Sequence, residues 1–478
     1  MLEQLHSLTA RMSELAWGPW LLVLLLGGGG FFLIYSRFLP FRYLGHAIDL
    51  LRGKYNDELD PGQITHFQAL SAALAGTIGM GNIGGVALAI HVGGPGAIFW
   101  MWVVAFFGIA TKFFTCSLAI MFRGKDSNGE IQGGPMYVIR EGLHRRWLFL
   151  AYVFAGAGLI GSLPAFQSNQ LTQIIREAAL IPAGFLALGE SHVMTDAVIG
   201  LLIALPSAII IFGGLKRIAR VASAVVPFMA VLYVGTALVT LLFHSTEVPA
   251  LFGAIFKDAF TGEAAAGGSL LAVILIGVKR GAYSNEAGIG TEALAHGAAR
   301  TREPVREGLV AMLGPIVDTL LICTATALMI LLSGVWLDGD SNGVTLTANA
   351  FQALLGTTGL IIIFVCVVCF STTTIFTYSY YGSKCFGFLA GAQRQHWYRW
   401  VYILFIVIAA VVTLETAIGI IDTAFAIMAV PTMVSTLMLA PKVRAAALVY
   451  FRNLRAPPGE RQNLRPDLNP VTGRSARD

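Results

Sequence analysis

Two apolar stretches of the chain are interrupted by glycines and polar residues of the kind that bind small ligands. The stretch Ala75–Gly85 has five glycines and one asparagine, and the stretch Gly277–Gly290 contains Ser284, Asn285 and Glu286. Each glycine weakens a helix by about 1 kcal/mol, and unwound backbone in an apolar environment persists only where it lines a protein-enclosed cavity. We therefore expect two broken helices whose free peptide groups hold a ligand.

The composition places both stretches in a membrane protein. Of the 478 residues, 56% are hydrophobic and only 12% are charged, whereas an average soluble domain is roughly a quarter charged. This chain has too little charge to cover a water-facing surface of its size, which excludes soluble globular, disordered and disulfide-rich secreted classes. The five cysteines are scattered through apolar stretches, so no disulfide framework is expected.

A membrane-spanning helix needs about 20 mostly apolar residues. The segment 17–36 could also be a signal peptide, but no basic run precedes it and no small-residue cleavage site leads into a soluble domain, so we interpret it as a span. We predict an all-α polytopic membrane protein with eleven transmembrane helices, at about 17–36, 66–91, 97–122, 147–175, 196–214, 221–244, 268–297, 308–334, 352–381, 400–419 and 422–441.

Lys and Arg are concentrated on one side of this arrangement. The side that carries the C-terminus holds 26 of the 32 basic residues, in the segments 37–65, 123–146, 215–220, 298–307, 382–399 and 442–478. Cytoplasmic loops are enriched in Lys and Arg. We therefore predict that the N-terminus lies outside and the C-terminus in the cytoplasm, where the arginine-rich tail lies beside an anionic leaflet and binds no nucleic acid.

The two interrupted spans occupy matching positions in two groups of five. Because five is odd, the second group begins on the opposite side of the membrane, and the broken spans run antiparallel. Such paired interruptions are typical of secondary transporters with inverted repeats and a site near the midplane. The predicted parts are an extra N-terminal helix and cytoplasmic loop (1–65), the first repeat (66–244), an external connecting loop (245–267), the second repeat (268–441) and a disordered cytoplasmic tail (442–478).

Other interpretations of these residues are weaker. The glycines could serve close helix packing, but packing explains neither Asn82 nor the polar residues Ser284–Glu286. Gly79–Gly84 matches the dinucleotide fingerprint GxGxxG, yet it lies inside an apolar span rather than after a strand. Glu292 and His296 lack the spacing of a zinc hydrolase. We expect no enzyme and no organic cofactor, and a channel would need a filter or pore ring that the sequence does not display.

In these segments the sequence resembles the alanine or glycine:cation symporter family of the amino acid-polyamine-cation superfamily. The resemblance implies a 5+5 inverted-repeat fold like that of the neurotransmitter symporters and a multi-pass protein of a bacterial-type inner (plasma) membrane. It also implies symport of a small neutral amino acid with sodium by alternating access, with no obligate protein partner. A proton-coupled carrier, or one for another amino acid such as glutamine, is the alternative. The matching stretches are 76–86, 93–96, 133–137, 284–290 with 295–296, 318–319 with 323–324, and 379–382.

A zwitterionic substrate needs donors for its carboxylate and acceptors for its ammonium group. We expect the glycine-rich turn Thr77–Asn82 to supply backbone N–H groups, and Asn285 with the carbonyls of Gly281–Ser284 to accept from the ammonium. The resemblance implies that Gln167 is a ligand and that Tyr378, where the family usually has Trp, caps the pocket. The alternative for such amides is that they join helices. The predicted substrate-binding residues are Thr77, Gly79, Gly81, Asn82, Gln167, Asn169, Asn285 and Tyr378.

Sodium prefers oxygen ligands, and Ser371–Thr374 place hydroxyls on successive faces of a predicted helix. The resemblance implies that such hydroxyls bind sodium together with carbonyls of the first broken helix. The alternative is that each hydroxyl bonds back to a carbonyl of its own helix. The predicted sodium ligands are Gly76, Gly79, Ser371 and Thr372.

Five charged residues fall within or beside the predicted spans. Charges at such positions are costly and are functional candidates by default. A site with fixed excess charge would suit a zwitterion poorly, so we expect gating or structural ion pairs instead. These residues are Lys279, Arg280, Glu286, Glu292 and Asp318.

Overall fold

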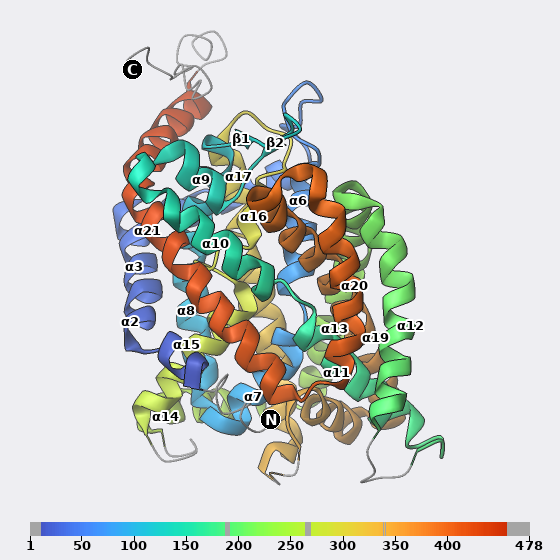
Figure 1. Cartoon of the computed structure of the whole chain (residues 1–478). Coiled ribbons are helices and arrows are strands. Elements are labelled where there is room, and N and C mark those ends of the chain that lie inside the picture. The colour runs from blue at the N-terminus through green and yellow to red at the C-terminus, as the bar shows by residue number, and fades with distance from the viewer. Residues whose placement is uncertain (1–10, 187–191, 263–268, 338, 340, 457–478) are drawn as a thin grey trace, which may run out of the picture.

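The protein is described by a computed structural model that covers residues 11–186, 192–262, 269–337, 339 and 341–456 (Figure 1). Nearly all its regular elements are helices, which confirms the predicted all-α class. Among these residues, eight helices are long and apolar enough to cross a membrane. They are His66–Gly93, Gly96–Met121, Arg145–Leu180, Val193–Phe212, Gly214–Phe243, Pro304–Ser333, Gly343–Ala390 and Ile418–Arg455.

Three predicted spans correspond to shorter elements. The span 17–36 is the apolar helix Pro19–Tyr35, 268–297 is a broken pair of helices, and 400–419 falls on a helix that ends at Val411. The number eleven therefore stays a prediction. The N-terminal elements are α2 (Pro19–Leu22), the π-helix η1 (Val23–Gly27), α3 (Gly28–Tyr35), α4 (Leu39–Arg42) and α5 (Leu44–Leu51).

The first predicted repeat begins with a helix broken after Thr77. A short antiparallel pair of strands and a short helix lie between its second and third spans. The elements are α6 (His66–Thr77), α7 (Met80–Gly93), α8 (Gly96–Met121), β1 (Gly124–Lys125), β2 (Ile131–Gln132), α9 (Pro135–Gly142), η2 (Arg145–Trp147), α10 (Leu148–Gly161), α11 (Ala165–Ile175), the π-helix η3 (Arg176–Leu180), α12 (Val193–Phe212) and α13 (Gly214–Phe243).

The second predicted repeat also begins with a broken helix. Its longest element bends at Gly356, whose φ of 62° lies outside the helical region. The elements are α15 (Leu270–Asn285), α16 (Glu292–His296), α17 (Pro304–Ala311), the π-helix η4 (Ile316–Cys323), α18 (Thr324–Ser333), η5 (Val335–Leu337), α19 (Gly343–Ala390), η6 (Ala392–Arg394), α20 (Gln395–Val411) and α21 (Leu414–Arg455).

Two segments predicted to lack regular structure are helical where they are described. The connecting loop 245–267 contains α14 (Val248–Thr261), which packs on α8: the Gly96 N–H donates to Asp258 Oδ2 over 2.8 Å. The tail prediction 442–478 is wrong for residues 442–455, which continue α21; residues 457–478 lie outside the described residues.

The end of α21 is helical because it has an apolar face at helical spacing. Its buried residues are Val443, Ala446, Ala447, Tyr450 and Phe451, which recur every three or four residues. Phe451 stacks on Tyr43 with the ring centroids 3.6 Å apart. This face therefore docks on the segment around α5.

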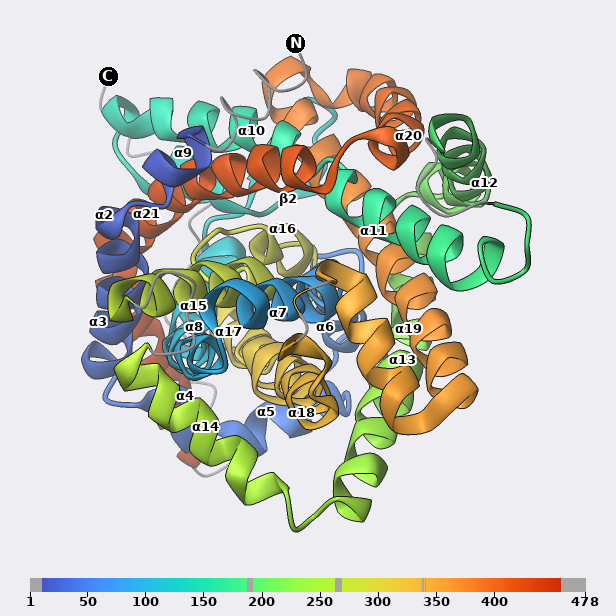
Figure 2. The same cartoon turned by 90° about the horizontal axis from the view of Figure 1, so that it is seen from below.

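The two broken helices lie side by side at the centre of the molecule and run in opposite directions (Figures 1 and 2). The most apolar 18-residue stretch of His66–Gly93 is 94% buried inside the protein. The corresponding stretch of Gly214–Phe243 is only 28% buried. The protein thus surrounds α6 and α7, whereas α12, α13 and α20 lie at the periphery (Figure 2). Interrupted helices can persist at membrane depth because protein, not lipid, encloses them.

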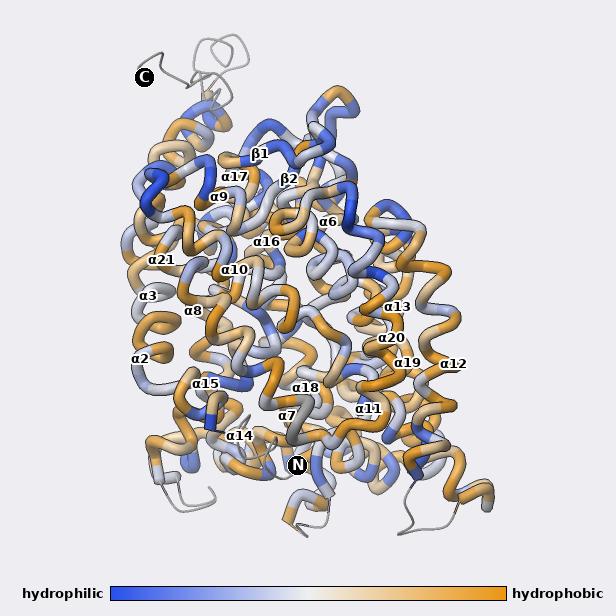
Figure 3. Tube along the Cα trace, in the orientation of Figure 1, coloured by the Kyte–Doolittle hydropathy of each residue, from blue (hydrophilic) through white to orange (hydrophobic). Residues whose placement is uncertain are grey.

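Five of the six predicted basic segments contact one another at one end of the molecule: 37–65, 123–146, 298–307, 382–399 and 442–478. Arg123 bonds to the carbonyls of Pro61 and Gly297, and the Ala392 N–H donates to the Ser127 hydroxyl. Hydrophilic residues gather at this end, around β1 and β2, and apolar residues cover the sides (Figure 3). We call it the basic end. The structure places the basic loops together but does not assign them to a side of the membrane.

Candidate functional site

The first break separates α6 from α7 at Ile78 and Gly79. The Gly79 N–H donates to Asn82 Oδ1 over 2.9 Å rather than to a carbonyl of α6. Because the last turn of a helix leaves carbonyls without partners, the peptide oxygens near Gly76 and Thr77 face the break. The glycines are needed where other side chains approach: a β-carbon on Gly79 would lie 2.5 Å from Thr374 Oγ1.

The second break runs from Glu286 to Thr291. Glu286, Gly288 and Gly290 have φ values of 56°, 86° and 96°, which a right-handed helix cannot accommodate and which glycine adopts at low cost. The residues Gly281–Ser284 are helical, so the predicted interruption there is wrong by a few residues. Asn285 ends α15, and its side chain donates to Thr319 Oγ1 over 3.2 Å and accepts from the Ala287 N–H.

The two breaks meet, and a buried carboxylate joins them. A β-carbon on Gly81 would lie 3.5 Å from Ser284 Cα. Asp318 Oδ1 accepts from Asn82 Nδ2 over 2.6 Å, while Oδ2 accepts from Ser284 Oγ over 2.8 Å and from Thr319 Oγ1 over 2.7 Å. Asp318 is fully buried and lies in the π-helix η4, a distortion that is frequent at functional sites.

One face of α19 lines the first break. Thr374 Oγ1 lies 3.5 Å from the Ile78 carbonyl oxygen, and a β-carbon on Gly76 would lie 3.1 Å from the Tyr381 hydroxyl. Tyr378 is on the same face, and its hydroxyl donates to Glu286 Oε1 over 2.5 Å. This face therefore connects the first break to the second.

Five buried polar atoms of this region make no hydrogen bond within the described protein. Buried polar groups are nearly always paired, and leaving one unpaired costs about 1–3 kcal/mol. All five offer lone pairs, which suits a cation or an ammonium group. They are Gln167 Oε1 on α11, Tyr283 Oη on α15, and Ser371 Oγ, Thr377 Oγ1 and Tyr381 Oη on α19.

Aromatic rings bring α11, the helix that carries Gln167, beside the breaks. Phe166, its neighbour on α11, packs edge-on against Tyr283 with the ring centroids 5.7 Å apart. Tyr283 packs in turn against Phe425 at 5.4 Å, and Phe425 against Tyr378 at 6.4 Å. The rings of α11, α15, α19 and α21 thus form one apolar cluster beside the breaks.

The structure does not bring two of the predicted ligands to this region. The Asn169 amide donates to the Val412 carbonyl over 2.5 Å and accepts from Gln170, so it joins α11 to the segment after α20. Thr372 is half-buried and donates to the carbonyls of Val368 and Cys369, as the alternative of back-bonding describes.

Sequence reasoning predicted Ser371 and Tyr378 but missed Thr374, Thr377 and Tyr381, which the structure also places at the break, although a signal was available. Ser371, Thr374, Tyr378 and Tyr381 recur every three or four residues, which is the spacing of one helix face. Thr377 lies on the same face. Tyr283 carried no comparable signal because it lies among residues expected to be unwound.

The expected ion pairs are confirmed for the two basic residues only. Lys279 and Arg280 bind the buried Asp422 over 2.7 and 2.8 Å, which links α15 to α21. Glu286 accepts from the hydroxyls of Tyr378 and Thr291. The carboxylates of Glu286, Glu292 and Asp318 form no ion pair within the described residues, and hydroxyl or amide groups donate to them instead. These three carboxylates are therefore held by neutral donors.

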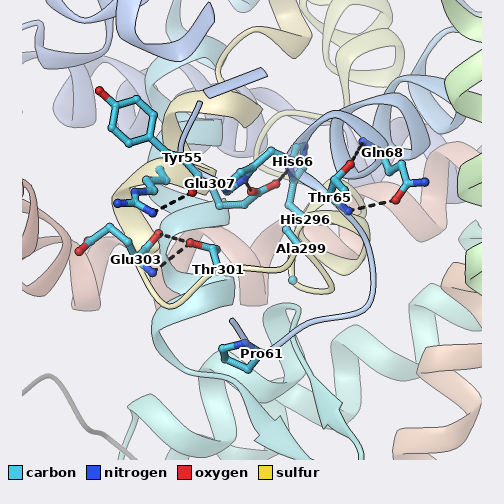
Figure 4. Close-up of polar contacts among 12 residues, drawn as sticks. Tyr55, Pro61, Thr65, His66, Gln68, His296, Ala299, Thr301, Glu303 and Glu307 are labelled. Atoms are coloured by element: carbon cyan, nitrogen blue, oxygen red, sulfur yellow. Dashed lines mark hydrogen bonds and ion pairs between the residues drawn. The ribbon is translucent and has the colours of Figure 1, made fainter. Parts of the chain in front are cut away.

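At the basic end, the segments that flank the two broken helices are joined by backbone hydrogen bonds. The Gln63 N–H donates to the Ala298 carbonyl over 2.9 Å, and the Arg300 N–H donates to the Ile64 carbonyl over 2.7 Å. Glu307 accepts from both His66 and His296 (Figure 4). We call segments 61–66 and 296–301 with these contacts the zipper.

Arg123 holds the zipper from one side. Its guanidinium donates to the carbonyls of Pro61, Gly297, Ala299 and Thr301. Burial lowers the pKa of Arg123 to about 10, so the group stays charged at neutral pH. The zipper therefore joins the segment before α6 to the segment after α16.

We expect Arg123→Gln to loosen the zipper. Hydrogen bonds from a charged donor contribute about 1.5–3 kcal/mol each, and every 1.4 kcal/mol changes an opening equilibrium about tenfold. Amide hydrogen exchange of Gln63, Arg300 and Thr301 should therefore accelerate at least tenfold in the purified protein. Arg145→Gln is the matched control because Arg145 is exposed and lies outside the zipper. Equal exchange rates in the wild type and Arg123→Gln would contradict the role of Arg123.

A protein-family model and individual related proteins indicate the same family for this chain. A model of the sodium:alanine symporter family matches residues 2–463. The sodium/alanine symporter AgcS of Methanococcus maripaludis is 40% identical over 438 residues, which cover 91% of this chain and 94% of that protein. The probable sodium/glutamine symporter GlnT of Bacillus subtilis is 33% identical over 460 residues, 95% of this chain and 93% of that protein.

A solved structure shares the fold. The crystal structure of MhsT in complex with L-phenylalanine superposes with a TM-score of 0.56, at 12% identity, and covers 81% of this chain and 99% of that one. At this identity the likeness concerns the fold alone, and it confirms the predicted fold class.

Proposed function

The chain belongs to the sodium:alanine symporter family, a family of multi-pass membrane proteins for amino-acid:cation symport, and from this premise we propose that it couples sodium entry to uptake of a small neutral amino acid. The alanine or glycine class is the proposed substrate. Sodium moving inward down a 100 mV potential releases about 2.3 kcal/mol per charge, which can drive accumulation of a zwitterion that carries no net charge.

The observation that carries the proposal is the group of unpaired oxygens beside two helix breaks. The Ser371 hydroxyl and the peptide oxygens near Gly76 and Gly79 supply the hard ligands that sodium prefers. Gln167 Oε1 and the hydroxyl of Tyr381 supply acceptors for an ammonium group. The beginning of α7 supplies N–H groups and a partial positive charge for a carboxylate.

We assign further roles to predicted residues by their place around the breaks. Tyr378 closes the site from α19 and limits the size of the substrate side chain, and Asn82, Gly81 and Asn285 shape the junction between the breaks. Thr77 contributes its carbonyl rather than its hydroxyl. Asn169 joins α11 to the segment after α20, and Thr372 bonds to its own helix, so we assign neither to ligand binding.

The proposed cycle is alternating access. The central helices rock against the surrounding helices as one group, and the zipper parts when the site opens toward the basic end. The proposed orientation puts the basic end in the cytoplasm of a bacterial-type inner membrane, and the proposed domains are the two repeats, 66–244 and 268–441.

Binding and transport test this function directly. We expect one or a few small neutral amino acids to raise the melting temperature of the purified protein, and more so with sodium than with potassium, because ligand binding stabilises the native state by mass action. In proteoliposomes, an inward sodium gradient should drive uphill uptake of the same amino acid. If uptake depends on a proton gradient and not on sodium, the coupling ion is the proton rather than sodium. A preference for glutamine would change the substrate class.

Ser371 and Thr372 form a matched pair for the sodium site. Ser371→Ala removes a buried hydroxyl that has no hydrogen-bond partner among the described residues, whereas Thr372→Val removes one that bonds to its own helix. We expect the sodium concentration for half-maximal uptake to rise roughly tenfold in Ser371→Ala, which equals about 1.4 kcal/mol, and to stay near the wild-type value in Thr372→Val. An unchanged sodium dependence in Ser371→Ala would remove this hydroxyl from the proposed ligands.

A further inference from the structure

A polar cavity lies at the basic end of the molecule. Its volume is about 160 Å³, and it opens between the turn that joins α12 to α13, the last turns of α19 and the first turn of α20. The charged and amide side chains that line it are Lys384, Arg399, Gln63 and Gln395. None of these residues belongs to the proposed transport site.

Neither cation of this cavity has an anionic partner among the residues that the structure describes. Lys384 lies over the Tyr380 ring, with Nζ 5.3 Å from the ring centroid. Neither Lys384 nor Arg399 forms an ion pair or a hydrogen bond with another described residue. The acidic residues that interact electrostatically with Lys384 are Asp126 and Glu130 of the β1–β2 hairpin. Partly buried cations without partners are costly, so the cavity is electrostatically suited to an anion.

The surroundings of the cavity add to its positive potential. Lys216, Arg217 and Arg220 lie at the start of α13, within a few residues of Gly214 and Leu215, which line the cavity. A Lys ammonium group binds phosphate as a point charge, and an Arg guanidinium binds two phosphate oxygens at once. The two glutamine amides can donate to the remaining oxygens.

We propose that this cavity binds a phosphate group, held by Lys384 and Arg399 and supplied by an anionic phospholipid. A lipid is the favoured source because residues of α12, α13 and α20, which lie at the periphery of the molecule, line one side of the cavity (Figure 2). Large apolar side chains are exposed on the adjoining surfaces of α12 and α20, where acyl chains would lie: Leu201, Leu205, Ile209, Trp400, Val401 and Leu404. Basic pockets between transmembrane helices are known to hold anionic head groups.

The test uses the full chain purified in a neutral detergent, without amino acid. Its melting temperature is measured with added phosphatidylglycerol, with the zwitterionic phosphatidylcholine, and with inorganic phosphate against chloride at equal ionic strength. We expect phosphatidylglycerol to raise the melting temperature by about 3 °C or more beyond phosphatidylcholine, as binding to the native state requires. If inorganic phosphate alone raises the melting temperature, the cavity still binds phosphate, but its ligand is the soluble anion rather than a lipid.

The variants distinguish lipid binding in the cavity from a general effect of positive surface charge. Lys384→Gln with Arg399→Gln should abolish the lipid-specific shift, and native mass spectrometry should find fewer retained phosphatidylglycerol molecules. Lys125→Gln with Arg394→Gln removes the same charge from exposed positions at the same end and should keep the wild-type shift. The proposal is overturned if the cavity pair responds like the wild type, or if neither anion stabilises the wild type. If the pair does not fold, each single variant should show a reduced shift.

Discussion

Replacing Asp318 by alanine should reduce sodium-driven amino-acid uptake to about 1% of the wild type or less and should lower the melting temperature by several degrees. The carboxylate accepts hydrogen bonds from Asn82, Ser284 and Thr319, so its removal leaves three buried donors without their acceptor. Each such donor costs about 1–3 kcal/mol, and a total of about 3 kcal/mol corresponds to roughly a hundredfold change in an equilibrium. Because Asn82 and Ser284 belong to different breaks, their relative position is lost.

Two variants control this experiment. Asp318→Asn keeps the volume but replaces one acceptor oxygen by a donor, so we expect a folded protein with reduced uptake even if the alanine variant does not fold. Asp49→Ala removes a half-exposed carboxylate that pairs with Lys54 at the surface and should change stability by less than about 0.5 kcal/mol. Wild-type uptake and melting temperature in Asp318→Ala would show that this carboxylate does not hold the breaks together.

Replacing Gln167 by alanine should weaken amino-acid binding about 10- to 100-fold while the melting temperature without ligand changes little. Gln167 Oε1 is buried and makes no hydrogen bond to the described protein, so its removal breaks no contact of that oxygen. A hydrogen bond to a charged ammonium group contributes about 1.5–3 kcal/mol, which sets the expected loss. Isothermal titration of the folded variant with the transported amino acid measures it.

Asn169 gives the matched contrast because it lies two residues away on the same helix. Its amide bonds to the Val412 carbonyl and to Gln170. We expect Asn169→Ala to lower the melting temperature, since it leaves the Val412 carbonyl unpaired, while the affinity of the folded protein for the amino acid stays near the wild-type value. If both alanine variants lose stability equally and keep their affinity, Gln167 joins helices and is not a ligand.

The two breaks illustrate how far local sequence information reaches. Glycine density and polar residues inside apolar runs predicted both interruptions, because helix propensity and the cost of unpaired backbone act within a few residues. The second break begins at Glu286 rather than near Gly281, since a residue with positive φ ends α15 and no propensity scale ranks Glu as a residue that ends a helix. Within the described residues, the end of α21 was misjudged for a similar reason: its polar residues suggested a tail, but its apolar face docks beside α5.

By itself, the sequence determined the membrane class, the antiparallel pair of broken helices and the concentration of basic loops, since hydropathy, glycine content and charge are properties of short stretches. Only the tertiary structure decided which side chains meet. It paired Lys279 and Arg280 with Asp422 and placed Asp318 between the breaks. It also directed Thr374 rather than Thr372 toward Gly79, and it joined segment 61–66 to segment 296–301 by backbone hydrogen bonds. These partners are separated by up to hundreds of residues, and the direction of a side chain around a helix, together with the packing of neighbouring helices, selects one partner among many that are chemically equivalent.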